Sequence, residues 1–177
     1  MFIATSLDGF IARENGDIGW LTDPVASVDH KGATPPSKTG DYDALMKRVD
    51  HLVMGRGTYE KVLTFDSWPF DAIPVLVLSR SLAPDVDKRV TVVHSVDDAV
   101  TLLNERLARA VYVDGGRTIQ SFLRDDLIDE ITVTRAPVLI GSGLPLFGEI
   151  GSDIQLSLQS VAARAGLVHT HYRVVRG

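Results

Sequence analysis

The stretch from Val111 to Leu123 constrains the fold of this chain more than any other. It begins with the apolar run Val111-Tyr112-Val113, breaks at Gly115-Gly116, and then places apolar residues at helical spacing, at Ile119, Phe122 and Leu123. This order predicts a strand, a tight turn and a helix. Glycine lets the backbone approach a ligand closely, and the free N–H groups of a helix start favour an anion, most often a phosphate. A sharp bend without a ligand uses the same residues, so the motif alone leaves both interpretations open.

The bulk composition narrows the class of protein. The chain has 177 residues, of which 45% are hydrophobic, so we expect one compact domain over residues 1–177. A formal net charge of −5, with no basic run interleaved with aromatic residues, argues against a nucleic-acid partner. The absence of cysteine excludes disulfides, thiolate metal sites and cysteine nucleophiles. No apolar run has the length of a membrane span and the start lacks a basic signal-peptide region, so we expect a cytoplasmic protein without a membrane partner.

The first part of the chain reads as a buried strand, a bend at Asp8-Gly9, and a short extended continuation. Trp20 follows on an expected loop, where it is either packed into the core or forms a wall of a ligand cleft. Residues 22–40 are rich in Pro, Gly, Ser and Thr without a period, which is typical of a functional lid or of disorder. A helix is then predicted with Asp41 in its first turn, where the helix dipole favours a carboxylate.

Two more buried strands end in cationic or hydroxyl-bearing turns. Arg56 comes directly after a strand that ends at Gly55, and Ser79-Arg80-Ser81 follows the apolar run Val75–Leu78. In open α/β sheets, ligands bind beyond the carboxyl ends of the strands. We therefore expect these turns to meet the glycine pair at one edge of the sheet, although either arginine could instead pair with surface carboxylates.

Near the C-terminus apolar and polar residues alternate, with Ile154, Leu156 and Leu158 separated by polar residues. This pattern predicts an antiparallel hairpin that turns at Ala165-Gly166. The fold class is therefore α/β, a single domain with a mostly parallel central sheet, antiparallel C-terminal strands and helices on both faces. His169 and His171 lie on one face of the last strand. Because no third ligand is nearby, we interpret them as part of a solvated face and predict no metal site.

Five segments together resemble the dihydrofolate reductase fold, and more closely the C-terminal reductase domain of the bifunctional riboflavin-biosynthesis deaminase-reductase. They recur in the family's order, as Ser6-Leu7-Asp8-Gly9-Phe10-Ile11-Ala12, Met54-Gly55-Arg56-Gly57-Thr58-Tyr59-Glu60, Val77-Leu78-Ser79-Arg80-Ser81, Val113-Asp114-Gly115-Gly116-Arg117 and 137–147. The resemblance implies a reductase that uses NADPH, acts on a small molecule and forms a homodimer.

The resemblance also implies where the cofactor binds. The diphosphate would lie at the turn and helix start, formed by Asp114, Gly115, Gly116, Arg117 and Thr118. The other cofactor-binding residues would be Gly55, Arg56 and Thr58 towards the adenosine, Leu78, Ser79 and Arg80 towards the 2′-phosphate, and Ala4, Ile11, Gly16 and Ile18 around the nicotinamide. An arginine and a hydroxyl at a strand end suit a phosphate monoester, whereas an acidic residue there favours a free ribose. This argument selects NADPH over NADH.

In this family the chemistry is hydride delivery to a C=N or carbonyl carbon, together with a proton. The resemblance makes Asp41 and Trp20 the catalytic candidates, with Asp41 as proton source, Thr134 beside it, and Trp20 facing nicotinamide and substrate. Folate reductases carry the helix carboxylate soon after the loop tryptophan, whereas residues 22–40 separate the two here. We therefore favour a riboflavin-type reductase that acts on a heterocyclic or ribosylated pyrimidine. The alternatives are folate-like pteridine reduction and an NADPH-binding protein with little or no turnover.

Overall fold

The computed structural model describes residues 1–22, 40–70, 73–164 and 166–176, except for the side chains of Thr22 and Asp41. The strands are β1 (Phe2–Thr5), β2 (Phe10–Ala12), β3 (His51–Gly55), β4 (Val75–Leu78), β5 (Val90–Val93), β6 (Val111–Asp114), β7 (Glu130–Arg135), β8 (Leu144–Pro145), β9 (Leu156–Arg164) and β10 (Leu167–Val174). The helices are α1 (Gly19–Thr22), α2 (Gly40–Met46), α3 (Arg56–Val62), α4 (Val96–Glu105) and α5 (Gly116–Arg124). None of these helices is long and apolar enough to cross a membrane.

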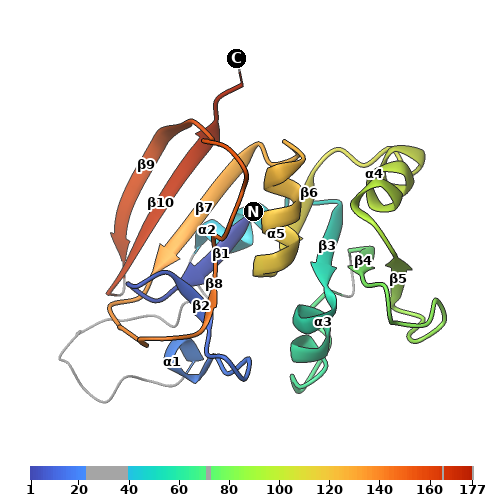
Figure 1. Cartoon of the computed structure of the whole chain (residues 1–177), viewed down its shortest axis with the longest axis horizontal. Coiled ribbons are helices and arrows are strands. Elements are labelled where there is room, and N and C mark those ends of the chain that lie inside the picture. The colour runs from blue at the N-terminus through green and yellow to red at the C-terminus, as the bar shows by residue number, and fades with distance from the viewer. Residues whose placement is uncertain (23–39, 71–72, 165, 177) are drawn as a thin grey trace.

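The strands form two four-stranded sheets and a short ribbon. One sheet is parallel, in the order β5-β4-β3-β6, and the other is mixed, in the order β1-β7-β10-β9. In the mixed sheet β1 runs parallel to β7, while β10 is antiparallel to both of its neighbours. The hydroxyl of Tyr112 on β6 donates to the carbonyl of Phe2 on β1 at 2.7 Å, so the two sheets lie side by side. Helix α5 lies over their junction (Figure 1).

The strand sequences explain why helices cover both faces. Leu52, Val53 and Met54 are fully buried although they point alternately to opposite faces of β3. Val53 packs in a core with α5 residues and with Ile131 and Val133 of β7, whereas Leu52 and Met54 pack in a second core with residues of α2 and α3. A continuous apolar strand of this kind is typical of a sheet that is covered on both sides. The predicted fold class is therefore confirmed.

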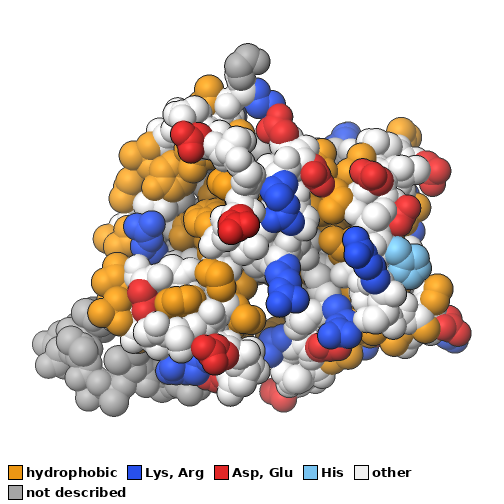
Figure 2. Space-filling model, in the orientation of Figure 1, with side chains coloured by type: hydrophobic (Ala, Val, Ile, Leu, Met, Phe, Trp, Pro, Cys, Tyr) orange, Lys and Arg blue, Asp and Glu red, His pale blue; other side chains and the backbone are white. Residues whose placement is uncertain are grey.

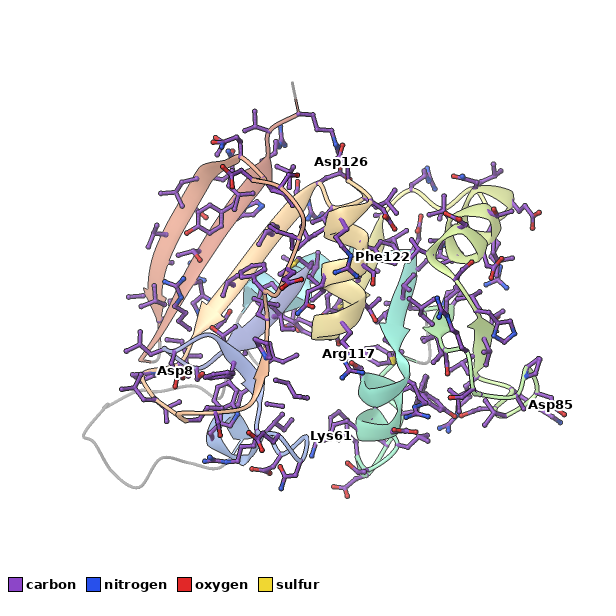
Figure 3. The ribbon with its side chains drawn as sticks, in the orientation of Figure 1. Asp8, Lys61, Asp85, Arg117, Phe122 and Asp126 are labelled. Carbon is purple, nitrogen blue, oxygen red and sulfur yellow. The ribbon has the colours of Figure 1, made fainter. Side chains whose placement is uncertain are left out.

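Asp8 fixes the antiparallel ribbon of β2 and β8 against the rest of the molecule. Its carboxylate accepts the Ser6 hydroxyl at 2.5 Å and the backbone N–H groups of Ile140 and Gly141 at 3.1 and 2.8 Å. The hydrogen bond from Ser6 is the main reason why the pKa of this carboxyl is lowered. The bend at Asp8-Gly9 predicted from the sequence thus anchors the loop that leads into β8 (Figure 3).

Two local predictions need correction. Trp20 was expected on a loop, but it lies in the short helix α1 and is buried. His169 was expected on a solvated face, but it is only 5% exposed, and its Nδ1 lies 2.9 Å from Thr134 Oγ1 of β7. His171 is half-buried, and no group of three metal-ligating side chains occurs among the described residues. The predicted C-terminal hairpin is confirmed as β9 and β10, while Ala165 at its turn lies outside the described residues.

Candidate functional site

Three parallel strands end at the same edge of the sheet and bring two helix starts into contact. Gly55 at the end of β3 pairs in register with Leu78 of β4, and Met54 pairs with Asp114 of β6. A Cβ on Gly55 would lie 2.7 Å from the Thr118 hydroxyl of α5. A Cβ on Gly115 would likewise overlap the Thr58 hydroxyl of α3. The β3–α3 and β6–α5 junctions therefore pack directly against each other, as expected from the sequence.

The glycine pair also meets the β2–β8 ribbon. Gly115 has φ +90° and ψ 132°, a conformation that side-chain-bearing residues rarely adopt. A Cβ on Gly116 would lie 2.9 Å from Ile11 Cδ1 and 3.0 Å from the carbonyl oxygen of Pro145. Close packing is thus one reason for these glycines, and the structure places Ile11 beside the glycine turn.

The start of α5 has the properties of an anion site. Its first four residues, Gly116 to Ile119, include no carboxylate, and the capping residue Gly115 has no side chain to occupy the free N–H groups. Arg117 is exposed in this first turn and lies at the end of α5 that is nearest to α3 (Figure 3). The positive end of the helix dipole and these N–H donors favour a bound phosphate.

Hydroxyl-bearing and cationic side chains also gather at the end of β4. Ser79 is buried, and its hydroxyl accepts the backbone N–H groups of Ser81 and Leu82 at 3.3 and 3.2 Å. Arg56 donates to the Ser81 hydroxyl at 3.0 Å and also lies 3.5 Å from Glu60. Arg80 is exposed. Lys and Arg side chains gather over α5 and between α5 and the parallel sheet (Figure 2), so this edge can attract a polyanionic ligand.

Asp114 is a titratable group at the same junction. Burial raises the pKa of Asp114 to about 6, against the opposing effect of the hydrogen bond from Gly115 N at 2.8 Å. The pKa of Tyr42 is in turn raised to about 12, mainly by burial and also by the nearby Asp114 charge. From the sequence, Asp114 is expected among the cofactor-binding residues, but its raised pKa is not expected. The available signal was a carboxylate that directly follows an apolar strand and precedes two glycines.

The remaining predicted residues lie on the other side of the glycine turn. Ala4 is half-buried on β1, beside Thr134 in the register of the mixed sheet. Gly16, with φ +80°, and Ile18 belong to the loop that leads into α1. Asp17 of that loop accepts the N–H of Gly19 at 3.1 Å and so fixes the start of α1. The backbone of Asp41 lies at the start of α2 as predicted, but its side chain lies outside the described residues.

The fold and this edge define an α/β protein of the dihydrofolate reductase-like class. The family model of the RibD C-terminal domain matches residues 1–169, and the chain therefore belongs to the RibD C-terminal domain family. The predicted resemblance is confirmed.

Relatives and solved structures agree with this membership. The chain is 32% identical over 176 residues to the uncharacterized protein YwjB of Bacillus subtilis (strain 168), with 97% of this chain and 95% of that protein covered. It is similar to the crystal structure of a putative riboflavin biosynthesis protein from Shewanella sp. PV-4, with a TM-score of 0.84, 40% identity, and coverage of 99% and 97%. It shares the fold of a diaminohydroxyphosphoribosylaminopyrimidine deaminase/5-amino-6-(5-phosphoribosylamino)uracil reductase from Thermotoga maritima, with a TM-score of 0.65, 17% identity, and coverage of 98% of this chain and 55% of that chain.

Proposed function

We propose that the protein is an NADPH-dependent reductase of the riboflavin-biosynthesis type, which reduces a ribosylated pyrimidine. Membership of the RibD C-terminal domain family supports an oxidoreductase with a nicotinamide cofactor. The observation that carries the proposal is the meeting of the β3–α3 junction, the end of β4 and the β6–α5 junction at one edge. Hydroxyls, arginines and a free helix start gather there, which is the donor set that a dinucleotide with an additional phosphate needs.

The residues present fit such a cofactor. The N–H groups at the start of α5, with Arg117 and Thr118, would hold the diphosphate beside Gly115 and Gly116. Arg56 and Thr58 would bind the adenosine end, and Ser79 with Arg80 would bind the 2′-phosphate. When bound, the nicotinamide would supply a hydride for the substrate carbon. Ile11 and Ala4 border the position assigned to that ring.

The reaction also needs a proton, and two carboxyl groups are candidates for its source. Asp114, with its pKa raised to about 6, holds a proton for part of the time near neutral pH. Asp41 remains the candidate suggested by its place at the start of α2. We favour Asp41 as proton source, because Asp114 lies at the glycine turn assigned to the diphosphate, whereas the proton is needed beside the nicotinamide.

The reductase activity itself is the first prediction. We expect the protein to oxidise NADPH in the presence of 5-amino-6-(5-phosphoribosylamino)uracil, measured by the loss of NADPH absorbance, and to leave NADPH unchanged with dihydrofolate. Oxidation with dihydrofolate alone would favour the pteridine-reductase alternative. Tight binding of NADPH without turnover of either compound would favour a binding protein instead.

Specificity for NADPH is the second prediction. Replacing Arg80 by alanine removes a charged donor from the assigned 2′-phosphate position, which is worth about 1.5–3 kcal/mol, or roughly 10- to 100-fold in Kd. We expect this loss for NADPH and almost none for NADH, measured by fluorescence titration of both cofactors. Lys88→Ala is the matched control, because Lys88 is another exposed cation in the loop before β5. Equal losses for NADPH and NADH would contradict the assignment of Arg80.

We also propose that two copies associate through β9. This strand is the outer strand of the mixed sheet and is exposed along nearly its whole length. Hydrophobic side chains gather over β9 and β10 (Figure 2), among them the exposed Leu156, Leu158 and Val161. A long, exposed edge strand with apolar side chains favours association with a second copy.

A further inference from the structure

A histidine follows the outer strand of the parallel sheet, at the same edge as the proposed cofactor site. β5 is that outer strand and runs parallel to β4, with Val93 opposite Leu78. The backbone N–H of Ser79 donates to the Val93 carbonyl at 2.9 Å. His94, the first residue after β5, therefore lies beside Ser79, the first residue after β4. His94 is not among the residues that the family resemblance assigns to the cofactor.

The contact between these two residues fixes the tautomer of the imidazole. His94 Nδ1 lies 2.8 Å from the backbone carbonyl oxygen of Ser79. A carbonyl oxygen only accepts hydrogen bonds, so Nδ1 carries a proton in the neutral ring as well as in the charged ring. Nε2 of the neutral ring is then an acceptor, and it becomes a donor only when the ring gains its charge.

Nε2 is available to a ligand. His94 is exposed, and no residue in the described part of the chain forms a hydrogen bond with its Nε2. The charged groups on the adjoining segments are Arg80, after β4, and Asp97 and Asp98, in the first turn of α4. The pKa of the Asp98 carboxyl is lowered, mainly by a hydrogen bond from the Ser95 side chain and also by the His94 ring. The Asp98 carboxylate thus favours the charged form of His94, whereas Arg80 opposes it.

We propose that His94 binds the 2′-phosphate of the cofactor through Nε2, and that it makes the preference for NADPH over NADH depend on pH. The protonated ring donates a charge-assisted hydrogen bond to the phosphate, whereas the neutral ring presents a lone pair to it. Arg56 reaches the same strand end through its hydrogen bond to Ser81, so cations from three segments surround the assigned phosphate position. This inference rests on the proposed reductase function, because it specifies how that cofactor is recognised.

The direction of the pH effect follows from the two charges. Histidine gains its charge as the pH falls from about 8 to about 5. A phosphate monoester keeps its second negative charge down to about pH 6. The contact is strongest where the ring is charged and the phosphate is a dianion. Affinity for the phosphorylated cofactor should therefore rise as the pH falls from about 8 to about 6, and the contribution of His94 should be lost as the pH rises again.

Titrations with the oxidised cofactors, which are stable in acid, test the inference. We expect the Kd of the unmodified protein for NADP⁺ to be about tenfold lower at pH 6 than at pH 8, which is the value of one charge-assisted hydrogen bond, and the Kd for NAD⁺ to be nearly constant. In His94→Gln the amide can still donate to the Ser79 carbonyl, but the rise in NADP⁺ affinity should disappear. His171→Gln is the matched control, because His171 is a half-buried histidine of the other sheet and should keep the rise. An unchanged pH dependence in His94→Gln, or equal losses for NADP⁺ and NAD⁺, would overturn the proposal.

Two further measurements separate a contact with the phosphate from a structural role. His94→Lys has a charged donor at all of these pH values, so it should bind NADP⁺ tightly at pH 6 and at pH 8. In NMR spectra of the unmodified protein, NADP⁺ should keep the His94 ring protonated to higher pH, and NAD⁺ should not. Weak NADP⁺ binding by a folded His94→Lys protein, or the same response of the His94 ring to both cofactors, would show that His94 does not contact the 2′-phosphate. The NMR spectra need no variant and decide if His94→Gln does not fold.

The two proposals fail separately in these experiments. Cofactor binding is measured without turnover, so a protein that binds NADP⁺ through His94 but reduces no ribosylated pyrimidine refutes only the reductase activity. A protein that turns over this substrate with NADPH, while His94→Gln leaves the pH dependence in place, refutes only the role of His94. A protein that binds neither NADP⁺ nor NAD⁺ refutes both.

Discussion

Replacing Gly115 by alanine is expected to abolish measurable NADPH binding and to lower the free energy of unfolding by roughly 2–6 kcal/mol. The backbone at Gly115 has φ +90°, which costs about 1–3 kcal/mol for a residue with a Cβ. The new methyl group would also overlap the Thr58 hydroxyl, and overpacking of this kind costs about 1–3 kcal/mol more. Relief of that overlap must separate the β6–α5 turn from α3, which displaces the N–H groups assigned to the diphosphate.

A matched control lies in α3 itself. A Cβ on Gly57 would have no atom within 4 Å, so Gly57→Ala should keep NADPH affinity and gain up to about 1 kcal/mol from helix propensity. Chemical denaturation and cofactor titration of both variants give the comparison. A Gly115→Ala protein that binds NADPH like the unmodified protein would show that this turn does not form the diphosphate site.

The sequence was sufficient to predict the fold and the meeting of the strand ends. The apolar runs that end at Gly55, Leu78 and Val113 are continuous, because both faces of these strands are buried, and parallel strands must end at one edge. The glycine turn at Gly115 was also predictable, because the backbone conformation of this turn is one that only glycine adopts readily.

The side-chain environments were less predictable, because they depend on pairs that are distant in the sequence. His169 is buried beside Thr134, which is 35 residues away in the sequence. The raised pKa of Asp114 likewise comes from burial in the folded protein, which the residues near Asp114 in the sequence do not encode. The sequence does not decide whether Trp20 packs into the core or forms the wall of a cleft. Its burial beside Ala136 and Leu167 depends on residues near the other end of the chain.

Replacing Asp114 by asparagine is expected to stabilise the cofactor-free protein at neutral pH. Burial raises the pKa of Asp114 from 3.8 to about 6, so the folded state disfavours the charged form. Above about pH 6 the carboxylate is ionised in the folded and unfolded states, and its burial costs up to about 3 kcal/mol. Below about pH 4 both states hold the proton and this cost disappears. The unmodified protein should therefore gain stability, relative to Asp114→Asn, as the pH falls from about 6 to 4.

Asparagine keeps an acceptor for the N–H of Gly115 and has no charge at any of these pH values. We therefore expect Asp114→Asn to be more stable than the unmodified protein by up to about 3 kcal/mol near pH 8, and equally stable near pH 4, in urea denaturation at each pH. A stability difference that does not vary with pH would show that Asp114 has an ordinary pKa in the folded protein.

The same variant separates the two candidate proton sources. If protonated Asp114 supplies the proton, kcat of the unmodified protein falls as the pH rises above about 6, and Asp114→Asn loses on the order of 10²–10⁴-fold in kcat. If Asp114 only orients Gly115, asparagine preserves both kcat and its pH profile, and Asp41→Asn should instead show the loss. A gain in stability together with a loss of turnover would mean that the buried acid at this strand end is retained for catalysis at the expense of stability.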